Sequence, residues 1–565
     1  MFKIIKQTAT VLAAPVIMIG VLSAQAEAAT FSLLEATVAD INEAFDARAL
    51  TSQQLVQLYL NRIEAYDKQG PSINSIITIN LKALETAAAL DLERQNTGHR
   101  SPLHGIPVIL KDNFDTFDLP TTGGSLALQN SIPPDDAFLV KQLRDAGAVI
   151  IAKSNLTELA RGGNTISSLG GQTLNPYDLG RTPGGSSGGT GAAIAANFGT
   201  IGTGSDTGQS VRSPASANSL VGIRPTSGLL SRDGIIPNAN RETAGPITRT
   251  VTDTAIMLDV LAGFDPADPV TESSIGKIPK SYTDFLDANG LKGARIGVVR
   301  NLFGSAPINA EVNAVINAQI EKMASLGATI SPITIPNFNE LSSNLSAGLY
   351  ESKDLLNDYF ASLGPNAPIK SLEEFLASGK YDPSLESGLR QAQAIESPLE
   401  EPEYTKILQN QEVFEQALLK LMDDAQLDAL VYPHQQRLVV PVGQPQVERN
   451  GILASGTGFP AITVPGGFSS SSESAPIGVP IGIEFFGRPF SEPTLIKLAY
   501  SYEQATMNRL IPTSVPSLPG ETFEYEAVPE PSSTVAVTLF GLTALGLKLN
   551  QRRKLHSAHT RLMES

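Results

Sequence analysis

The order of apolar and polar positions along the chain predicts helices that alternate with short buried strands. In 51–67, apolar residues recur at three- and four-residue intervals from Leu55 to Ile63, which is the spacing of one helix face. Thr51 and Gln54 precede this face at capping-box spacing. A helix is therefore expected over Thr51–Asp67, as part of the scaffold.

The same alternation continues as far as about residue 262. Helices are expected at Phe138–Ala146 and Thr190–Ala196, and short apolar runs that read as strands lie at Gly105–Lys111, Ala148–Ala152, Thr200–Gly204 and Ser219–Ile223. Helices interleaved with such runs are typical of an α/β fold. The first of these strands would carry Lys111 at its end.

The middle of the chain has a different character. Residues 263–426 are more helical and acidic, with proline-rich joints, and predict a helical insertion or cap over the sheet. The apolar runs Ile462–Val464 and Ile477–Phe486 then return to the sheet. Residues 516–531, rich in Pro and Glu, are expected to form a linker.

The first residues of the chain have the parts of a secretory signal. Lys3 and Lys6 are followed by the apolar stretch Val11–Leu22 and by Ala-x-Ala steps that end at Ala26 and Ala28. Residues 1–29 are therefore predicted to be a signal peptide. The mature protein is expected to be exported to the periplasm, the cell surface or the medium.

The last residues suggest a membrane-held tail. Val528-Pro-Glu-Pro531 precedes an apolar run, Ser532–Leu547, and a basic cluster that begins at Lys548. Sixteen helical residues would reach about 24 Å, short of the ~30 Å hydrocarbon core. This layout resembles a PEP-CTERM sorting tail, which implies an anchor over 532–565 and an exosortase-like processing enzyme as partner. The extension Leu555–Ser565 departs from that pattern, and a simple membrane anchor is the alternative.

Composition removes several kinds of chemistry. The 565 residues include no Cys, which excludes disulfides, thiolate nucleophiles and Cys-bearing zinc sites. Lys and Arg number 41 against 57 Asp and Glu, a net charge of −16, so nucleic acid is not expected as a partner. Between the two terminal segments only three histidines remain, His99, His104 and His434, which limits histidine-based catalysis.

A Gly- and Ser-rich segment, Thr182–Gly191, is the most conspicuous motif. It lacks the Gly-Lys-Ser/Thr of a phosphate loop and the flanking features of a dinucleotide fingerprint. Its Gly184–Gly188 portion matches the G-x-S-x-G nucleophile elbow. That interpretation predicts an esterase of the α/β-hydrolase type, with Ser186 as nucleophile and His434 as its base.

Two neighbouring segments favour another interpretation. Together with Gly204–Arg212 and Gly105–Asn113, the Gly- and Ser-rich segment resembles the amidase signature family of serine hydrolases. Further matching motifs are Ala152–Ala160, Leu174–Tyr177, Gly222–Thr226, Gly245–Thr250 and Gly458–Gly466. The resemblance runs from about residue 52 to 505. It implies a catalytic domain over 30–515 with a large mixed sheet flanked by helices, and hydrolysis of a carboxamide or acyl-amide through a serine acyl-enzyme.

The resemblance also implies the roles of individual residues. Ser210 would be the nucleophile, Ser186 the bridging cis-serine and Lys111 the base, and lysine can act so if burial lowers its pKa. The oxyanion hole would consist of the backbone N–H groups of Thr207, Gly208, Gln209 and Ser210, and the supporting residues would be Ser187, which is expected to orient Lys111, Asp206 and Arg212. No metal or cofactor is implied.

The substrate is left open by the sequence. Many members of the family have Gly-Gly-Ser where this chain has Gly208-Gln209-Ser210, so Gln209 puts any specificity borrowed from relatives in doubt. The pocket walls are expected to come from the middle segment and from Gly451–Gly467. A second alternative is a surface-anchored binding protein that uses this scaffold without catalysis.

Overall fold

The computed structural model describes residues 28–527. Residues 31–523 form one compact unit, and the described residues of the two chain ends belong to another. Strands β1 (Ala28–Ser32) and β15 (Thr522–Glu526) pair in a two-stranded sheet. Apart from Ala28 and Ala29 in β1, the predicted signal peptide lies outside the described residues, and so does the predicted tail. Within 28–527, no helix has the length and apolar character needed to cross a membrane.

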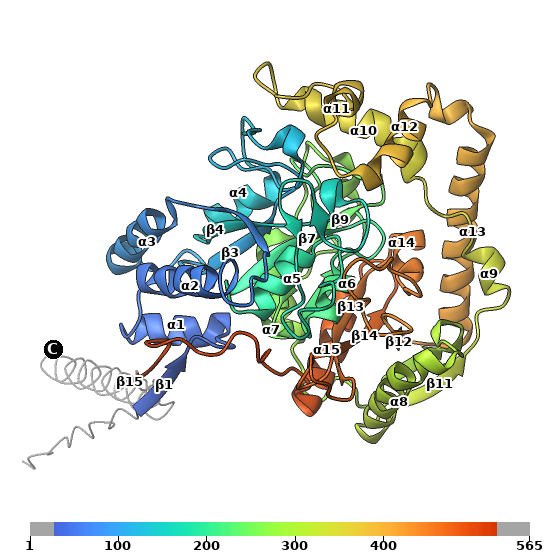
Figure 1. Ribbon diagram of the computed structural model, residues 1–565. Helices are drawn as coiled ribbons and strands as arrows, with labels where there is room; N and C mark the ends of the chain where they lie inside the picture. Colours follow the sequence, from blue (N-terminus) through green and yellow to red (C-terminus); the bar gives the residue numbers. More distant parts are fainter. Residues whose placement is uncertain (1–27, 528–565) are drawn as a thin grey trace, which may run out of the picture. The chain divides into compact units, whose positions relative to one another are not determined.

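A mixed sheet of eleven strands lies at the centre of the larger unit, counted over the described residues (Figure 1). Its strands, in spatial order, are β11 (Thr329–Ile333), β10 (Arg295–Val299), β12 (Ala429–Pro433), β14 (Pro480–Phe486), β13 (Ala461–Phe468), β8 (Val221–Arg224), β9 (Thr243–Thr248), β7 (Ile201–Asp206), β3 (Pro107–Lys111), β4 (Val149–Ser154) and β2 (Ile76–Ile79). The pairs β3–β4, β3–β7, β10–β11 and β10–β12 are parallel, and the others are antiparallel. The predicted α/β fold with a large mixed sheet is confirmed. A further small sheet consists of β5 (Ile166–Ser167) and β6 (Gly171–Gln172).

The helices accompany the strands as the alternating pattern predicts. They are α1 (Val38–Asp46), α2 (Ser52–Tyr66), α3 (Ala83–Thr97), α4 (Phe138–Asp145), α5 (Gly188–Ala195), α6 (Arg212–Ala217), α7 (Val251–Leu261), α8 (Ala310–Ser325), α9 (Phe338–Leu341), α10 (Gly348–Ser362), α11 (Leu372–Ser378), α12 (Glu386–Gln393), α13 (Pro402–Asp424), α14 (Ile452–Thr457) and α15 (Glu492–Thr506). The capping box of α2 is formed as expected: the N–H of Thr51 donates to Oε1 of Gln54 at 2.9 Å, and the N–H of Gln54 donates to Oγ1 of Thr51 at 3.1 Å.

Residues 263–426, where a helical insertion or cap is expected, contain both helices and strands. Helices α9 to α13 follow one another from Phe338 to Asp424, but the same stretch also supplies strands β10 and β11. These strands extend the central sheet beyond β12 through parallel pairing. Their short apolar runs become strands because partners far along the chain complete their backbone hydrogen bonds, and local patterning does not reveal those partners.

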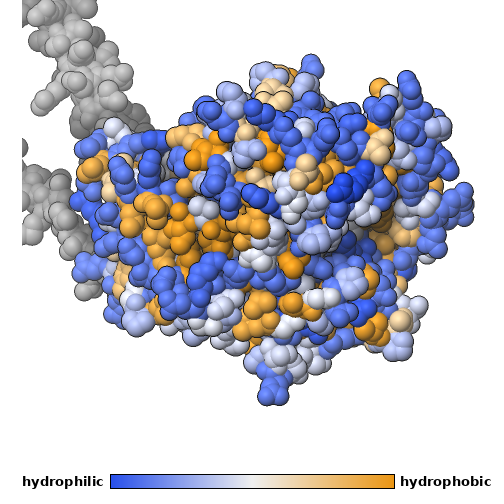
Figure 2. Space-filling view, turned by 45° about the horizontal axis from the view of Figure 1, so that its top comes forward, coloured by the Kyte–Doolittle hydropathy of each residue, from blue (hydrophilic) through white to orange (hydrophobic). Residues whose placement is uncertain are grey.

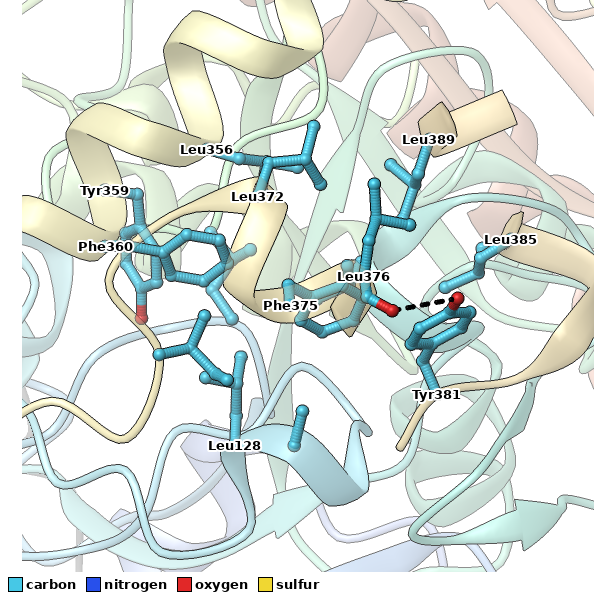
Figure 3. Close-up of a cluster of buried hydrophobic side chains, with 14 of the residues drawn as sticks. Leu128, Leu356, Tyr359, Phe360, Leu372, Phe375, Leu376, Tyr381, Leu385 and Leu389 are labelled. Carbon is cyan, nitrogen blue, oxygen red and sulfur yellow. Dashed lines mark hydrogen bonds between the residues drawn. The ribbon is translucent and has the colours of Figure 1, made fainter. Parts of the chain in front are cut away.

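Part of this segment forms a cap with an apolar core. Figure 3 shows Tyr359 and Phe360 of α10 beside Phe375 of α11 and Tyr381, with successive ring centroids 5.2–6.3 Å apart. This cluster also contains Leu128, Leu159 and Ile236, which come from segments that follow strands β3, β4 and β8. Burial of these side chains therefore holds the cap against the rest of the compact unit.

The face drawn in Figure 2 is mostly hydrophilic, with areas of hydrophobic residues between the hydrophilic ones.

The chain beyond residue 515 is not simply the linker expected from its composition. Glu521 is 1% exposed and forms an ion pair of 2.9 Å with the buried Arg62 of α2. Residues 516–521 therefore belong to the packed unit, while 528–531 lie outside the described residues.

Candidate active site

The site begins at the carboxyl ends of two neighbouring parallel strands. The register of β3 on β7 pairs Ile109 with Gly202, which places the end of β3 beside Ser205 near the end of β7. The N–H of Lys111 donates to Oγ1 of Thr203 at 3.2 Å. The prediction that a strand delivers Lys111 at its end is confirmed.

Lys111 is buried and bonded to serine hydroxyls. Its side chain is 0% exposed, so it is not a solvated surface charge. Nζ lies 2.8 Å from Oγ of Ser186 and 2.9 Å from Oγ of Ser205. Burial lowers the pKa of Lys111 to about 7, although the Glu242 and Asp206 carboxylates act in the opposite direction.

The Gly- and Ser-rich segment brings Ser186 to this lysine. The peptide bond between Gly185 and Ser186 is cis. The N–H of Ser187 donates to the carbonyl of Ser210 at 3.2 Å, so the two serine segments lie against each other. Helix α5 starts directly afterwards, and a Cβ on Gly189 would lie 2.1 Å from the carbonyl oxygen of Asn155. Only glycine permits this close contact.

The loop Thr207–Ser210 follows β7 and is held from behind by two arginines. Arg212 donates to the carbonyl of Gly208 at 2.7 Å, and Arg224 donates to the carbonyl of Asp206. Burial alone would raise the pKa of Asp206, but the Arg212 and Arg224 guanidinium groups outweigh burial and lower it. Asp206 and Arg212 thus act as structural supports of the loop.

The carbonyl groups of this loop accept hydrogen bonds from the arginines, but its backbone N–H groups are unpaired. Among residues 28–527, the backbone N–H groups of Thr207, Gly208, Gln209 and Ser210 have no hydrogen-bond acceptor. All four residues line a pocket of about 290 Å³. Four successive unpaired donors at a pocket wall can bind an oxyanion.

The pocket has walls from several parts of the chain, as predicted. The middle segment contributes Leu345 to Gly348, Glu351 and Gln411, and the later segment contributes Ile452, Ser455 and Gly456. Other lining residues are Ala160, Gly162, Asn238, Ala239, Arg241 and Arg449. Ser210 is 7% exposed and reaches the pocket, whereas Ser186 is 0% exposed.

The structure does not pair His434 with Ser186. Nδ1 of His434 is 2.5 Å from Oε2 of Glu484, and both side chains are fully buried. Glu484 also accepts a hydrogen bond of 2.6 Å from Arg212. His434 is therefore part of the support behind the loop, and the esterase interpretation that depends on it has no geometric basis.

One expected supporting role differs in the structure, and some contacts of the site were not predicted. Ser187 does not bond to Lys111: its hydroxyl donates to the carbonyl of Ser205 at 3.3 Å. Ser205 instead holds Lys111 directly, a contact that the sequence reasoning missed. Arg224 and Glu242 were also missed, although Arg224 stands in the motif Gly222–Thr226 and could have been singled out as a charge in an otherwise apolar run.

Known amidases are similar to this chain over most of its length. The Amidase family model matches residues 54–496. A probable amidase of Arabidopsis thaliana is 37% identical over 505 residues, covering 86% of this chain and 92% of the relative. A glutamyl-tRNA(Gln) amidotransferase subunit from Methanosarcina acetivorans is 34% identical over 472 residues, covering 81% and 94%. The crystal structure of native peptide amidase from Stenotrophomonas maltophilia has a TM-score of 0.77 and 37% identity, covering 85% of this chain and 98% of that one.

The fold and these relatives define an α/β enzyme that hydrolyses amide C–N bonds. The chain belongs to the amidase signature family. The alternative of a binding protein without catalysis is therefore not favoured.

Proposed function

We propose that this enzyme cleaves carboxamides through an acyl-enzyme on Ser210, with Ser186 and Lys111 as its proton relay. The observation that carries the proposal is the buried Lys111 amine, 2.8 Å from the Ser186 hydroxyl and next to the segment of Ser210. A serine hydroxyl is a weak nucleophile until a base accepts its proton. At a pKa of about 7, a large share of Lys111 is neutral and able to do so.

The proposed reaction forms an acyl-enzyme on Ser210 and then hydrolyses it, with protons passing through Ser186. Neutral Lys111 accepts the proton of Ser186 while Ser186 accepts the proton of Ser210, and Oγ of Ser210 bonds to the carbonyl carbon of the substrate. The proton then returns through Ser186 to the leaving nitrogen, and the C–N bond breaks. Water attacks the resulting ester by the same relay, which releases the acid and restores Ser210.

The unpaired amides of 207–210 would stabilise the negative oxygen of the tetrahedral intermediate. Donors fixed in place before the reaction need no reorganisation, and removing one typically costs about a hundredfold to a thousandfold in kcat. Arg212 and Arg224 support this role because they fix the carbonyl groups on the other side of the same peptide units.

The substrate is proposed to be a small amide, with C-terminal peptide amides as the first class to test. This choice rests on the similarity to peptide amidase. Gln209 lines the pocket beside Ser210 and would contact the bound substrate. Its side chain distinguishes this pocket from that of relatives with two glycines before the serine.

Labelling with a fluorophosphonate tests the nucleophile. The probe is expected to label Ser210 and to label nothing in Ser210→Ala, while Lys111→Ala reduces both labelling and ammonia release by several orders of magnitude. Ser213→Ala is the matched control, because the Ser213 hydroxyl is buried without a hydrogen-bond partner among the described residues. Labelling of Ser186 in the Ser210→Ala variant would overturn the assignment.

We also propose export and C-terminal processing, on the grounds of the two terminal sequences alone. The body would end near 528–532 after an exosortase-like enzyme has cut the tail, and the basic residues that begin at Lys548 would keep the tail on the cytoplasmic side until then. Mass spectrometry of the C-terminal peptide from native cells tests this. Peptides from 555–565 in the surface-located protein would show that the tail is retained.

A further inference from the structure

Two arginines beside the pocket lack the partners that other charged groups of the site have. Arg449 lines the pocket and is exposed there. Among residues 28–527, its guanidinium group has neither a hydrogen-bond acceptor nor a carboxylate at ion-pair distance. Nε and Nη2 of Arg161 are likewise buried without a hydrogen-bond partner in the described chain, and the residues on either side of Arg161 line the pocket.

Arg449 lies close to the reacting groups. A Cβ on Gly163 would lie 2.5 Å from its Nη1, so the guanidinium group contacts the backbone there. A Cβ on Gly185 would lie 2.7 Å from the carbonyl carbon of Gly163. Gly163 therefore has Arg449 and the residue before Ser186 as close neighbours, which puts the arginine within reach of a substrate bound at Ser210.

The other charged groups that line the pocket are already engaged. Arg241 forms an ion pair of 2.6 Å with Glu415 and donates to the carbonyl of Gly456. The two oxygens of Glu351 accept hydrogen bonds from Tyr404, at 3.0 Å, and from the backbone of Asn240, at 2.8 Å. Among the described charged residues that line the pocket, Arg449 is thus the one left without a partner, and Arg161 lies next to two further lining residues.

The surroundings of the two arginines explain why this charge is available to a ligand. Desolvation at the pocket wall lowers the pKa of Arg449, with no carboxylate acting in the opposite direction, and burial lowers the pKa of Arg161 to about 10, with only Glu242 opposing. Both groups stay protonated at neutral pH. A guanidinium group that reaches a pocket without a partner can bond to an anion that enters the pocket, and such charge-assisted hydrogen bonds are stronger than neutral ones. The enzyme has 57 acidic residues, yet none of those that the structure describes is placed against Arg449.

We infer that the enzyme prefers amides that carry a carboxylate near the scissile bond, and that Arg449 binds this carboxylate. The inference rests on the proposed function, since it assigns a substrate class to the pocket of Ser210. An arginine suits this task because its planar fork of donors matches the two oxygens of a carboxylate. Selection then operates through charge rather than through the size of the substrate.

Matched peptide amides test the preference. Acetylated dipeptide amides with Glu or Met at either position have similar length and differ in charge. The wild-type enzyme is expected to hydrolyse a Glu amide at least about tenfold more efficiently in kcat/KM than its Met counterpart, and Arg449→Gln is expected to remove most of that ratio. Arg437→Gln is the control, because it removes the same charge from a nearby segment outside the pocket.

Protection of Ser210 gives a second readout that needs no turnover. The Glu amide is expected to slow fluorophosphonate labelling at a concentration about tenfold below that of the Met amide, and Arg449→Gln is expected to remove this difference. Equal kcat/KM and equal protection for the two amides in the wild-type enzyme would overturn the inference and leave the nucleophile assignment intact. Failure of the nucleophile assignment has a separate signature, namely labelling that persists in Ser210→Ala.

Discussion

Replacing Glu242 by Gln is expected to move the pH dependence of the reaction to lower pH. Glu242 is 4% exposed, and its carboxylate is the first of the two anions that raise the pKa of Lys111 against the effect of burial. One Glu242 oxygen accepts a 2.7 Å hydrogen bond from the N–H of Asn238. Glutamine retains an acceptor for that bond, so the substitution removes charge with little change of shape.

The size of the effect follows from the pKa of Lys111. Its displacement from 10.5 to about 7 corresponds to about 5 kcal/mol against the ammonium form, net of the two carboxylates. At pH 7, about half of Lys111 is then neutral, compared with about 0.03% for an ordinary lysine. Without the Glu242 charge, the pKa of Lys111 is expected to fall further below about 7, because one of the two opposing anions is removed.

Ammonia release from a peptide amide, followed from about pH 5 to about pH 9, measures this. The wild-type kcat/KM is expected to rise with pH to a plateau, with a midpoint near 7, because only the neutral amine accepts a proton. The midpoint of Glu242→Gln should lie lower. Glu351→Gln is the control, since Glu351 lines the pocket but is not among the groups that shift Lys111. A midpoint that stays the same or rises in Glu242→Gln would refute the reasoning.

Three further substitutions test the support of the site, with urea unfolding as the measurement. Tyr359→Phe removes the donor of a buried 2.8 Å bond to Asp115 and is expected to cost about 1–3 kcal/mol, because the carboxyl group loses its partner. Arg212→Met leaves the Asp206 and Glu484 carboxylates buried without it and should cost about 3–5 kcal/mol. Lys111→Met should abolish the rise in stability between about pH 7 and about pH 10.5, where the unfolded chain of the wild-type enzyme binds the proton that the folded one lacks.

The parts of the fold that the sequence predicts are those set by neighbours in the chain. The capping box of Thr51 and Gln54 joins residues three positions apart, and α2 starts where it indicates. The apolar run that ends at Lys111 forms β3, because its side chains are buried on both faces of the sheet, as expected of a strand between two parallel neighbours. Such signals need no knowledge of distant partners.

The contacts that escaped prediction join residues far apart. Ser205 reaches Lys111 across 94 positions, and Glu484 reaches Arg212 across 272. Nothing next to Glu484 in the chain indicates that its carboxylate will be buried against a guanidinium group. The first contact depends on the parallel pairing of β3 with β7, and the second on the packing of α6 against β14. Strands β10 and β11 also depend on partners that lie far away in the chain, so they were not predicted within a segment that otherwise has a helical pattern.

The end of the catalytic unit illustrates the same point and can be tested by truncation. Composition favours a boundary at 515, yet Arg62 is fully buried and depends on residues beyond that boundary: it pairs with Glu521 and donates to the carbonyl of Pro516. A chain that ends at 515 would leave this guanidinium group without its carboxylate. Loss of one partner of a buried pair typically costs about 3–5 kcal/mol.

The comparison is therefore between chains 30–515 and 30–527, unfolded in urea at the same pH. The shorter chain is expected to be less stable by about that amount, and Glu521→Gln in the longer chain should reproduce most of the loss. If both chains unfold at the same urea concentration, Arg62 must be satisfied by the carbonyl groups of Ala196 and Asn197 that it also contacts. In that case the boundary at 515 would stand. A loss in the shorter chain that Glu521→Gln does not share would assign the stabilisation to the backbone of 516–521 instead of the ion pair.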